Sequence, residues 1–352
     1  MMLSAGNGFI MQSEKYSRDN AGQSLKKYIL LKQGELAYNH GASKAKQFGC
    51  CYELTEPEAR IPYVYHCFKI TDHEYTPYIA MTLNNPKMDK QLKRLVSSSV
   101  RMDGLLNISF EDYMSVTLHL PSFSEQKRIA DFLRKIDERI VVQEKLLASL
   151  KKYKRGLLMH YFSDDKTKQW TLYSISQIGK VITGSTPPTN DRSNYDGDLM
   201  FCSPGDVGEE KYISSTEKRV SPKGFGLGRP IPPNSIIVTC IGLIGKLGIA
   251  TTGMITNQQI NSLVVSEGFD HEFIYYAFEN FFPEYRSKVS MQTLPILSKS
   301  EFEKLIIKVP VLDVQLKISS HLAAIDRRIE HTQKELNVLF EQRRGIIQQL
   351  FM

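Results

Sequence analysis

Two long stretches of the chain place apolar residues at the spacing of a coiled-coil helix. In residues 121–162 and again in 310–351, the apolar side chains recur in alternating steps of four and three positions, which is typical of helices that pack along a seam. Neither stretch has a proline after its first residue, so each is predicted to form one helix, roughly 55 Å long for about 37 residues. The predicted pairing residues are Ile129, Leu133, Ile136, Ile140, Leu147 and Leu150 in the first helix and Ile318, Leu322, Ile325, Ile329, Leu336 and Leu339 in the second.

The two stretches are copies of each other and align without a gap at an offset of 189 residues. The offset continues upstream of the helices, so each helix is the tail of a larger duplicated unit. Polar residues interrupt both seams at equivalent positions and can fix the register of a helix pair. Pairing the helices with each other is the simplest way to bury both apolar stripes, and pairing with a partner subunit is the alternative. Coinciding residues include Ser109 with Ser298, Tyr113 with Phe302, Gln126 with Gln315, Gln143 with Thr332, and Lys154 with Arg343.

The residues ahead of each helix have the pattern of a compact mixed domain. Residues 169–309 contain short β-rich runs separated by turns with Gly and Pro, and then a helical pattern at 273–285. Residues 1–120 loosely follow the same order. The matching runs are Gln33–Tyr38 with Asn234–Val238, Phe68–Ile70 with Leu263–Val265, and Tyr78–Ile79 with Phe273–Ile274.

These patterns predict an α+β protein, in which two globular α/β domains are separated by two long helices that form an antiparallel coiled coil. The predicted segments are a first domain (1–120), a helix (121–162), a short polar linker (163–168), a second domain (169–309) and a second helix (310–352).

Composition and charge narrow the classes of function. The chain has 352 residues, of which 41% are apolar, too many for a disordered protein and enough for two domains. The formal net charge is +7, and residues 121–167 hold 11 basic against 7 acidic residues. Their densest run, Lys151–Arg155, fits either a phosphate-binding patch or a solvated helix face. Apolar runs are too short for a membrane span, and the first residues lack a signal-peptide pattern, so we expect a cytoplasmic protein without membrane contact.

The sequence motifs that would indicate catalysis, nucleotide binding or metal binding are weak. The five cysteines are scattered without C-x-x-C spacing, which predicts reduced thiols rather than a zinc site or a disulfide framework. The glycines of 224–228 and 242–245 lack the context of a phosphate-binding loop. Ser185–Thr189 lacks both the Asp or Asn before its prolines and the aromatic after them that an adenine methyltransferase motif contains. Asp137 and Asp326 occupy equivalent helix positions, which favours packing or partner docking over acid–base chemistry. A noncatalytic protein without a metal site is therefore expected.

The order domain, helix, domain, helix resembles the specificity subunit of type I restriction-modification enzymes, over nearly the whole chain. The resemblance rests on the duplicated helices, on Trp170, Thr183–Pro187, Gly205-Asp206, Ile241–Gly245 and Thr256–Gln259 in the second domain, and on Leu3-Ser4, Gly8–Lys15 and Tyr28–Asn39 in the first. It implies two target recognition domains, each reading one half of a bipartite, asymmetric sequence in double-stranded DNA. The helices would hold the domains apart and bind DNA methyltransferase subunits, two of them, and restriction/translocase subunits would join for cleavage. S-adenosylmethionine, ATP and magnesium would then belong to partner subunits, and this chain would carry no cofactor.

Under this resemblance, the polar loops of both domains are the candidate DNA contacts. Lys and Arg contact phosphate, and sequence is read where Arg or Lys meets guanine or where Asn or Gln meets adenine. An ordinary surface role remains open for each residue, since only a minority of polar groups touch DNA. The candidates are Lys15, Tyr16, Arg18, Asn39, His40, Ser43, Lys44 and Lys46 in the first domain and Ser185, Thr186, Thr189, Asn190, Arg192, Tyr195, Lys218, Arg219 and Lys246 in the second. Asn257–Gln259 fits either adenine readout or hydrogen bonding to the backbone.

The first domain is shorter than the second. Residues 170–199 precede the segment 200–206, whereas the chain begins near the equivalent of that later segment, so an opening helix and loop are missing. A truncated or recombined allele, a misassigned start, or a layer supplied from elsewhere would each explain this. The functions left as alternatives are a coiled-coil adaptor between proteins and an inactive recombination cassette without DNA recognition. A self-contained methyltransferase or nuclease is the enzymatic alternative, and the motifs disfavour it.

Overall fold

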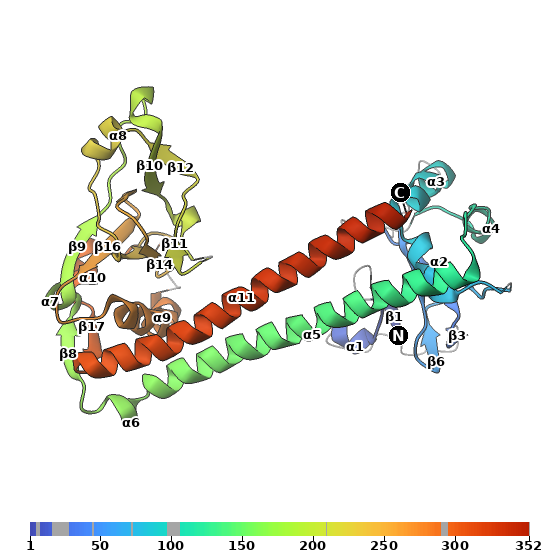
Figure 1. Ribbon diagram of the computed structural model, residues 1–352, viewed down its shortest axis with the longest axis horizontal. Coiled ribbons are helices and arrows are strands. Elements are labelled where there is room, and N and C mark those ends of the chain that lie inside the picture. Colours follow the sequence, from blue (N-terminus) through green and yellow to red (C-terminus); the bar gives the residue numbers. More distant parts are fainter. Residues whose placement is uncertain are drawn as a thin grey trace. The chain divides into compact units, whose positions relative to one another are not determined.

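The computed structural model describes residues 1–4, 8–15, 28–43, 46–71, 73–96, 106–208, 210–289 and 295–351. The chain forms two compact units, Met1–Glu144 with Lys334–Met352, and Lys145–Gln333. Each unit contains one globular domain and one stretch of each long helix (Figure 1).

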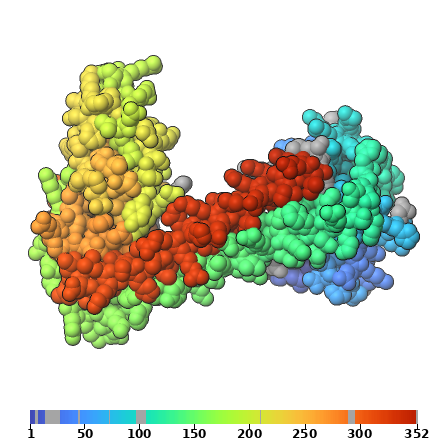
Figure 2. Space-filling view, in the orientation of Figure 1, coloured from blue at the N-terminus to red at the C-terminus, as the bar shows by residue number. Residues whose placement is uncertain are grey.

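The long helices are α5 (Phe123–Tyr161) and α11 (Leu312–Phe351), of 39 and 40 residues. Within each unit the two helices lie side by side and antiparallel, as the colours of Figure 2 show. The predicted pairing within the chain is therefore confirmed. Contacts that define the antiparallel order are Asp137 with Arg343 and Gln143 with Glu335 in the first unit, and Lys154 with Asp326 and Tyr161 with His321 in the second.

The predicted seam residues all turn away from solvent, but the first two in each helix have an additional role. Ile129 and Leu133 pack into the core of the first domain, and Ile318 and Leu322 pack into the core of the second. Among the twelve, the buried residues are Leu133, Ile140, Leu147, Leu150, Ile318, Leu322, Leu336 and Leu339, and the half-buried ones are Ile129, Ile136, Ile325 and Ile329.

The second domain is built on a five-stranded sheet in the order β11-β14-β13-β16-β9 and a smaller sheet in the order β12-β10-β15. A further strand pair, β8 with β17, leads into α11. The strands are β8 (Thr171–Ser174), β9 (Gly179–Thr183), β10 (Tyr195–Cys202), β11 (Tyr212–Ile213), β12 (Lys218–Val220), β13 (Ile236–Thr239), β14 (Leu247–Ala250), β15 (Ile255–Thr256), β16 (Ile260–Val265) and β17 (Ile306–Val309). The helices are α6 (Asp164–Thr167), α7 (Ile175–Ile178), α8 (Pro222–Leu227), α9 (His271–Val289), α10 (Lys299–Lys304) and two short 3₁₀ turns, η2 (Arg192–Asn194) and η3 (Pro204–Asp206).

Helix α6 lies within residues 163–168, the predicted linker. Its first turn contains Asp164 and Asp165. Their negative charges interact favourably with the positive, N-terminal end of the helix dipole. The Thr167 hydroxyl also donates to the Ser163 carbonyl oxygen (3.1 Å), so this segment is a helical turn.

The first domain is smaller, and its described residues form three separate sheets, β1-β2, β3-β6 and β5-β4-β7. Its elements are β1 (Met2–Ser4), β2 (Gly8–Ile10), α1 (Gln12–Lys15), β3 (Ile29–Lys32), β4 (Leu36–Asn39), β5 (Cys50–Glu53), β6 (Glu58–Ile61), β7 (His66–Phe68), α2 (Thr76–Leu83), α3 (Pro86–Leu95) and α4 (Phe110–Met114).

Strand pairing has the same register in the two domains. Strand β4 pairs antiparallel with β5 and β7, as β13 does with β14 and β16. Leu36 lies opposite Phe68 just as Ile236 lies opposite Leu263. The turns before these strands also agree, because Gly34 and Asn234 both adopt left-handed backbone with φ of +83° and +65°. Two of the three pairs of runs matched in the sequence therefore occupy equivalent strands, and the third pair lies in α2 and α9.

The domains differ at the strand before the long helix. In the second domain β17 pairs with β8, whereas residues 117–120, which the 189-residue offset places on β17, form no strand. Gln91 of α3 takes the place of a strand partner there, since its Oε1 accepts from Thr117 N (3.0 Å) and its Nε2 donates to Thr117 O (2.9 Å). Within the described part of the first domain, no counterpart of β8, α7 and β9 is present.

Candidate nucleic-acid interface

The loop after β9 carries several of the candidate contacts and is held against the turn between β15 and β16. Gly184 N donates to Ile260 O (3.0 Å), and Ser185 N donates to Thr256 O (2.8 Å). A side chain at Gly184 would collide with backbone oxygens of this turn, so glycine is needed for the close approach. The Thr186 hydroxyl donates to Gln258 Oε1 (2.5 Å). The start of the loop is therefore fixed on the second domain.

The far end of the same loop is fixed by its own hydrogen bonds. Tyr195 OH donates to Pro187 O (2.6 Å), and Asn194 Nδ2 donates to Pro188 O (3.0 Å). Asp191 accepts from Lys223 Nζ (2.7 Å), and this hydrogen bond lowers the pKa of the Asp191 carboxyl to about 2. Tyr195 therefore has a hydrogen bond within the loop. Four candidates of the loop are exposed at its surface: Thr186, Thr189, Asn190 and Arg192.

The other basic candidates of the second domain, besides Arg192, lie on or beside two different sheets. Lys218 and Arg219 belong to β12, which pairs with β10 directly after the loop just described. Both side chains are exposed, and Arg219 Nη1 donates to Asp198 O (3.1 Å). Lys246 instead ends the turn between β13 and β14, where its N–H donates to the Thr239 hydroxyl (3.0 Å). Lys218 and Arg219 thus lie on the strand that pairs with β10, and Lys246 lies in the turn between two strands of the larger sheet.

Residues 257–259 form hydrogen bonds within the chain, and adenine readout by them stays a prediction. Asn257 Oδ1 accepts from Gln259 N (3.0 Å), so these two residues stabilise the turn. Gln258 is exposed and holds Thr186.

In the first domain, two candidates are committed to intrachain contacts. Asn39 Nδ2 donates to Leu3 O (3.3 Å), and its Oδ1 accepts from Gly41 N (2.9 Å). His40 is buried, with its ring nitrogens 3.0 and 2.9 Å from the carbonyl oxygens of Leu106 and Val64.

Two more candidates of this domain form a turn: Lys46 N donates to the Ser43 hydroxyl (3.1 Å), and Lys46 Nζ donates to Asn84 O (2.7 Å). Tyr16, Arg18, Lys44 and the side chain of Lys15 lie outside the described residues. DNA contact by the candidates of either domain stays a prediction.

A largely buried ionic network, which the sequence did not reveal, attaches both long helices to the second domain. Lys154 Nζ of α5 lies 2.7 Å from Asp326 of α11 and 2.8 Å from Glu279 of α9. Tyr276 OH donates to Asp326 (2.6 Å) and accepts from Lys211 Nζ (2.8 Å). Burial opposes the charge of Lys154, but the carboxylates of Glu279 and Asp326 outweigh it and raise its pKa. Burial raises the pKa of Glu279, which Lys154 partly offsets. The predicted packing role of Asp326 is confirmed.

Two other kinds of feature are absent from the described residues. Within the ranges given above, no group of three or more His, Cys, Asp or Glu side chains is placed to hold a metal ion. No helix in the same ranges is long and apolar enough to cross a bilayer.

Comparison with known proteins agrees with this architecture. Residues 167–340 match the type I restriction modification DNA specificity domain. The MjaIX specificity subunit of Methanocaldococcus jannaschii is 31% identical over 178 residues, 49% of this chain and 41% of that protein. Residues 167–340 of the chain are thus similar to the DNA specificity domain of type I restriction-modification systems. The HindI specificity subunit of Haemophilus influenzae is also 31% identical, over 108 residues, 30% of this chain and 24% of that protein. The chain thus spans less than half the length of these curated relatives.

Solved structures show that the family fold extends over nearly the whole chain. The type I restriction-modification S subunit from M. genitalium matches with a TM-score of 0.63 and 14% identity, over 93% of this chain and 85% of that one. A chain from a structure of type I complex assembly matches with a TM-score of 0.56 and 15% identity, over 92% and 82%. Specificity subunits are the noncatalytic DNA-recognition chains of these systems.

Proposed function

We propose that this chain directs a type I restriction-modification complex to a bipartite, asymmetric DNA sequence. The internal duplication carries the proposal. The two domains share strand register and left-handed turns, so both present loops from an equivalent frame, yet the loop sequences differ. Two domains with equivalent strands can bind two half-sites, as the subunits of a dimeric DNA-binding protein do. Loops of different sequence can then recognise half-sites of different sequence.

In this proposal, affinity and sequence choice come from different residues. Exposed basic side chains such as Lys218 and Arg192 contact phosphate, which makes binding weaken with salt. Exposed amides such as Asn190 read base edges. Two methyltransferase subunits bind the paired helices, and restriction/translocase subunits join them in the cytoplasm. S-adenosylmethionine, ATP and magnesium bind to those partner subunits. The target adenine is flipped out of the duplex into the pocket of a methyltransferase subunit.

The test is co-expression with the methyltransferase encoded beside this chain, followed by mapping of methylated adenines in the host DNA. A bipartite motif is expected. Replacing Asn190 and Arg192 with alanine should alter the half of the motif read by the second domain and leave the other half unchanged. If the complex with the methyltransferase forms but no adenine is methylated, the first domain does not have the proposed recognition role. If no complex forms, the alternative function as a coiled-coil adaptor is favoured.

A further inference from the structure

Two side chains at the end of the loop after β9 hold the two prolines of that loop. Asn194 is only 1% exposed, and its Oδ1 is buried without a partner among the described residues, which is costly for an amide. The other end of the amide explains the residue, because Nδ2 donates to Pro188 O (3.0 Å). Tyr195 OH donates to Pro187 O (2.6 Å) in the same way. A proline has no N–H, so its carbonyl oxygen is the one backbone group through which the fold can hold it.

The residues that form these two bonds are themselves fixed at the start of α8. Ser221 N donates to Asn194 O (3.0 Å), and the Ser221 hydroxyl donates to Ser193 O (2.6 Å). Gly224 of α8 lies so close to Asn194 O that a side chain at Gly224 would collide with this oxygen. The side chains that hold the prolines therefore extend from a backbone that is itself fixed in place.

The exposed tip of the loop lies between the prolines and Asn194. The Asn190 side chain is exposed and has no hydrogen-bond partner among the described residues. An amide of this kind can donate to and accept from the edge of an adenine. Asn190 is therefore a free amide in a loop that is fixed at both ends, which is the arrangement that recognition of a base requires.

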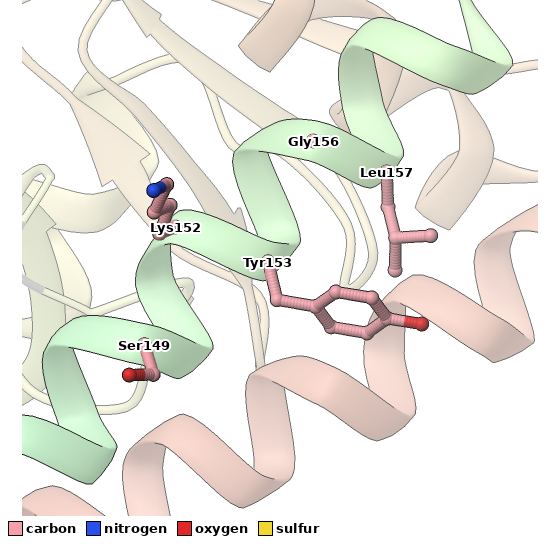
Figure 3. Close-up of a pocket in the computed structure, with 5 residues that line it drawn as sticks. All are labelled: Ser149, Lys152, Tyr153, Gly156 and Leu157. Carbon is pink, nitrogen blue, oxygen red and sulfur yellow. The ribbon is translucent and has the colours of Figure 1, made fainter.

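The pocket on α5 differs from this loop. Its lining comes from a single helix (Figure 3), and the side chains form no hydrogen bond or ion pair with the rest of the described chain. The loop instead has polar groups that buried and half-buried side chains hold in place. The residues that line the pocket are Ser149, Lys152, Tyr153, Gly156 and Leu157.

We propose that Asn194 and Tyr195 are positioning residues for half-site recognition by the second domain. Neither side chain contacts DNA in this proposal. They hold Pro187 and Pro188, and thereby keep Asn190 where its amide meets a base edge. A loop that is already ordered loses less conformational freedom when DNA binds, and its amide is placed accurately enough to distinguish bases. This inference rests on the proposed function and gives Tyr195 a role other than the predicted DNA contact.

The test measures how well the assembled complex distinguishes one base pair from another. The chain in complex with its methyltransferase is titrated, at one salt concentration, with the mapped target duplex and with duplexes changed at one base pair of the second half-site. Asn190→Ala should lower the ratio of the dissociation constants about tenfold at one of these base pairs. Tyr195→Phe and Asn194→Ala should each lower the ratio about threefold or more at the same base pair. Ratios for the first half-site should not change.

Tyr212→Phe is the matched control. It also removes a hydroxyl that donates a hydrogen bond within the second domain, to Glu272, but β11 lies at the opposite edge of the five-stranded sheet from β9. Its ratios should equal those of the unchanged chain. A further comparison adds Tyr195→Phe to a chain that already carries Asn190→Ala. If the hydroxyl acts through Asn190, this second substitution should have little further effect.

The outcomes separate this inference from the proposed function. If the unchanged chain and its methyltransferase give no methylated motif, the proposed function fails. If a motif exists but Asn190→Ala changes no ratio, the inference is overturned and the proposed function stands. The same holds if Tyr195→Phe and Asn194→Ala discriminate as well as the unchanged chain. A full additional loss from Tyr195→Phe in the Asn190→Ala chain would also overturn the inference, because the hydroxyl would then contact DNA itself.

Discussion

In each of the two units, a buried glutamine at an equivalent position of the repeat connects the globular domain to a long helix. In the first unit, Gln126 Oε1 accepts from Tyr75 N (3.0 Å) at the start of α2. In the second, Gln315 Oε1 accepts from Asp270 N (2.9 Å) just before α9. Both amides also donate to the proline carbonyl five residues earlier, at 2.9 and 2.8 Å. The amide thus fastens a domain helix to the chain entering α5 or α11.

The polar pair within the helix seam differs between the units. Arg343 and Asp137 in the first unit are each 40% exposed, whereas Lys154 and Asp326 in the second are 13% and 20% exposed. The positions are equivalent in the repeat, and in the second unit Glu279 and Tyr276 of α9 complete a network around the pair. Equivalent seam positions therefore form a solvated ion pair or a buried network according to the domain packed beside them.

The largest expected effect comes from removing the buried cation. Lys154→Ala leaves the Asp326 and Glu279 carboxylates without their nearest countercharge, which should lower the free energy of unfolding by about 3–5 kcal/mol. Arg343→Ala removes the equivalent but more exposed cation and should cost about 0–1 kcal/mol. Urea denaturation of both full-length variants measures the difference, and equal losses would contradict this comparison.

The glutamines should matter to a similar degree in both units. Gln126→Leu or Gln315→Leu leaves partly buried backbone groups without these partners, and each should lower the free energy of unfolding by about 1–3 kcal/mol. Gln348→Leu, at an exposed position of α11, is the control and should have little effect. A loss confined to one unit would show that the shared glutamine does not serve both domains alike.

The left-handed turns allow a smaller test. Gly34→Ala places a Cβ at φ of +83° and should lower the free energy of unfolding by about 1–2 kcal/mol. Asn234→Gly, at the equivalent turn with φ of +65°, should leave stability unchanged or slightly raised. Thermal melting of the two variants checks the expectation, and a stabilised Gly34→Ala would show that the turns are not equivalent.

The smallest effect concerns the loop of the second domain. The hydrogen bond from Lys223 lowers the pKa of Asp191 to about 2, from 3.8. A carboxyl with a lowered pKa stabilises the fold above its unfolded pKa, and this contribution is lost as pH falls through about 2. An NMR titration should therefore place the midpoint near 2, and Lys223→Met should move it toward 3.8. An unmoved midpoint would show that Lys223 is not the cause.

Much of the fold could be predicted from the sequence, because the patterns that indicate it are either local along the chain or repeated within it. The apolar period predicted both long helices to within two residues at their starts, and the repeat matched Leu36 with Ile236 in equivalent strands. Single side-chain roles were less accessible. Asn39 and His40 looked like surface residues of a polar loop, but they bond to Leu3, Leu106 and Val64, segments that only the folded domain brings near.

The sequence by itself determined that two equivalent helices follow two related domains, because periodicity and repetition are properties of the chain order. Only the tertiary structure decided that α5 and α11 pair with each other in each unit, since a partner subunit would satisfy the same apolar stripe. It also decided which seam cation is buried. Lys154 meets Glu279 across 125 residues of sequence, and burial depends on such distant neighbours, whose positions no local pattern encodes.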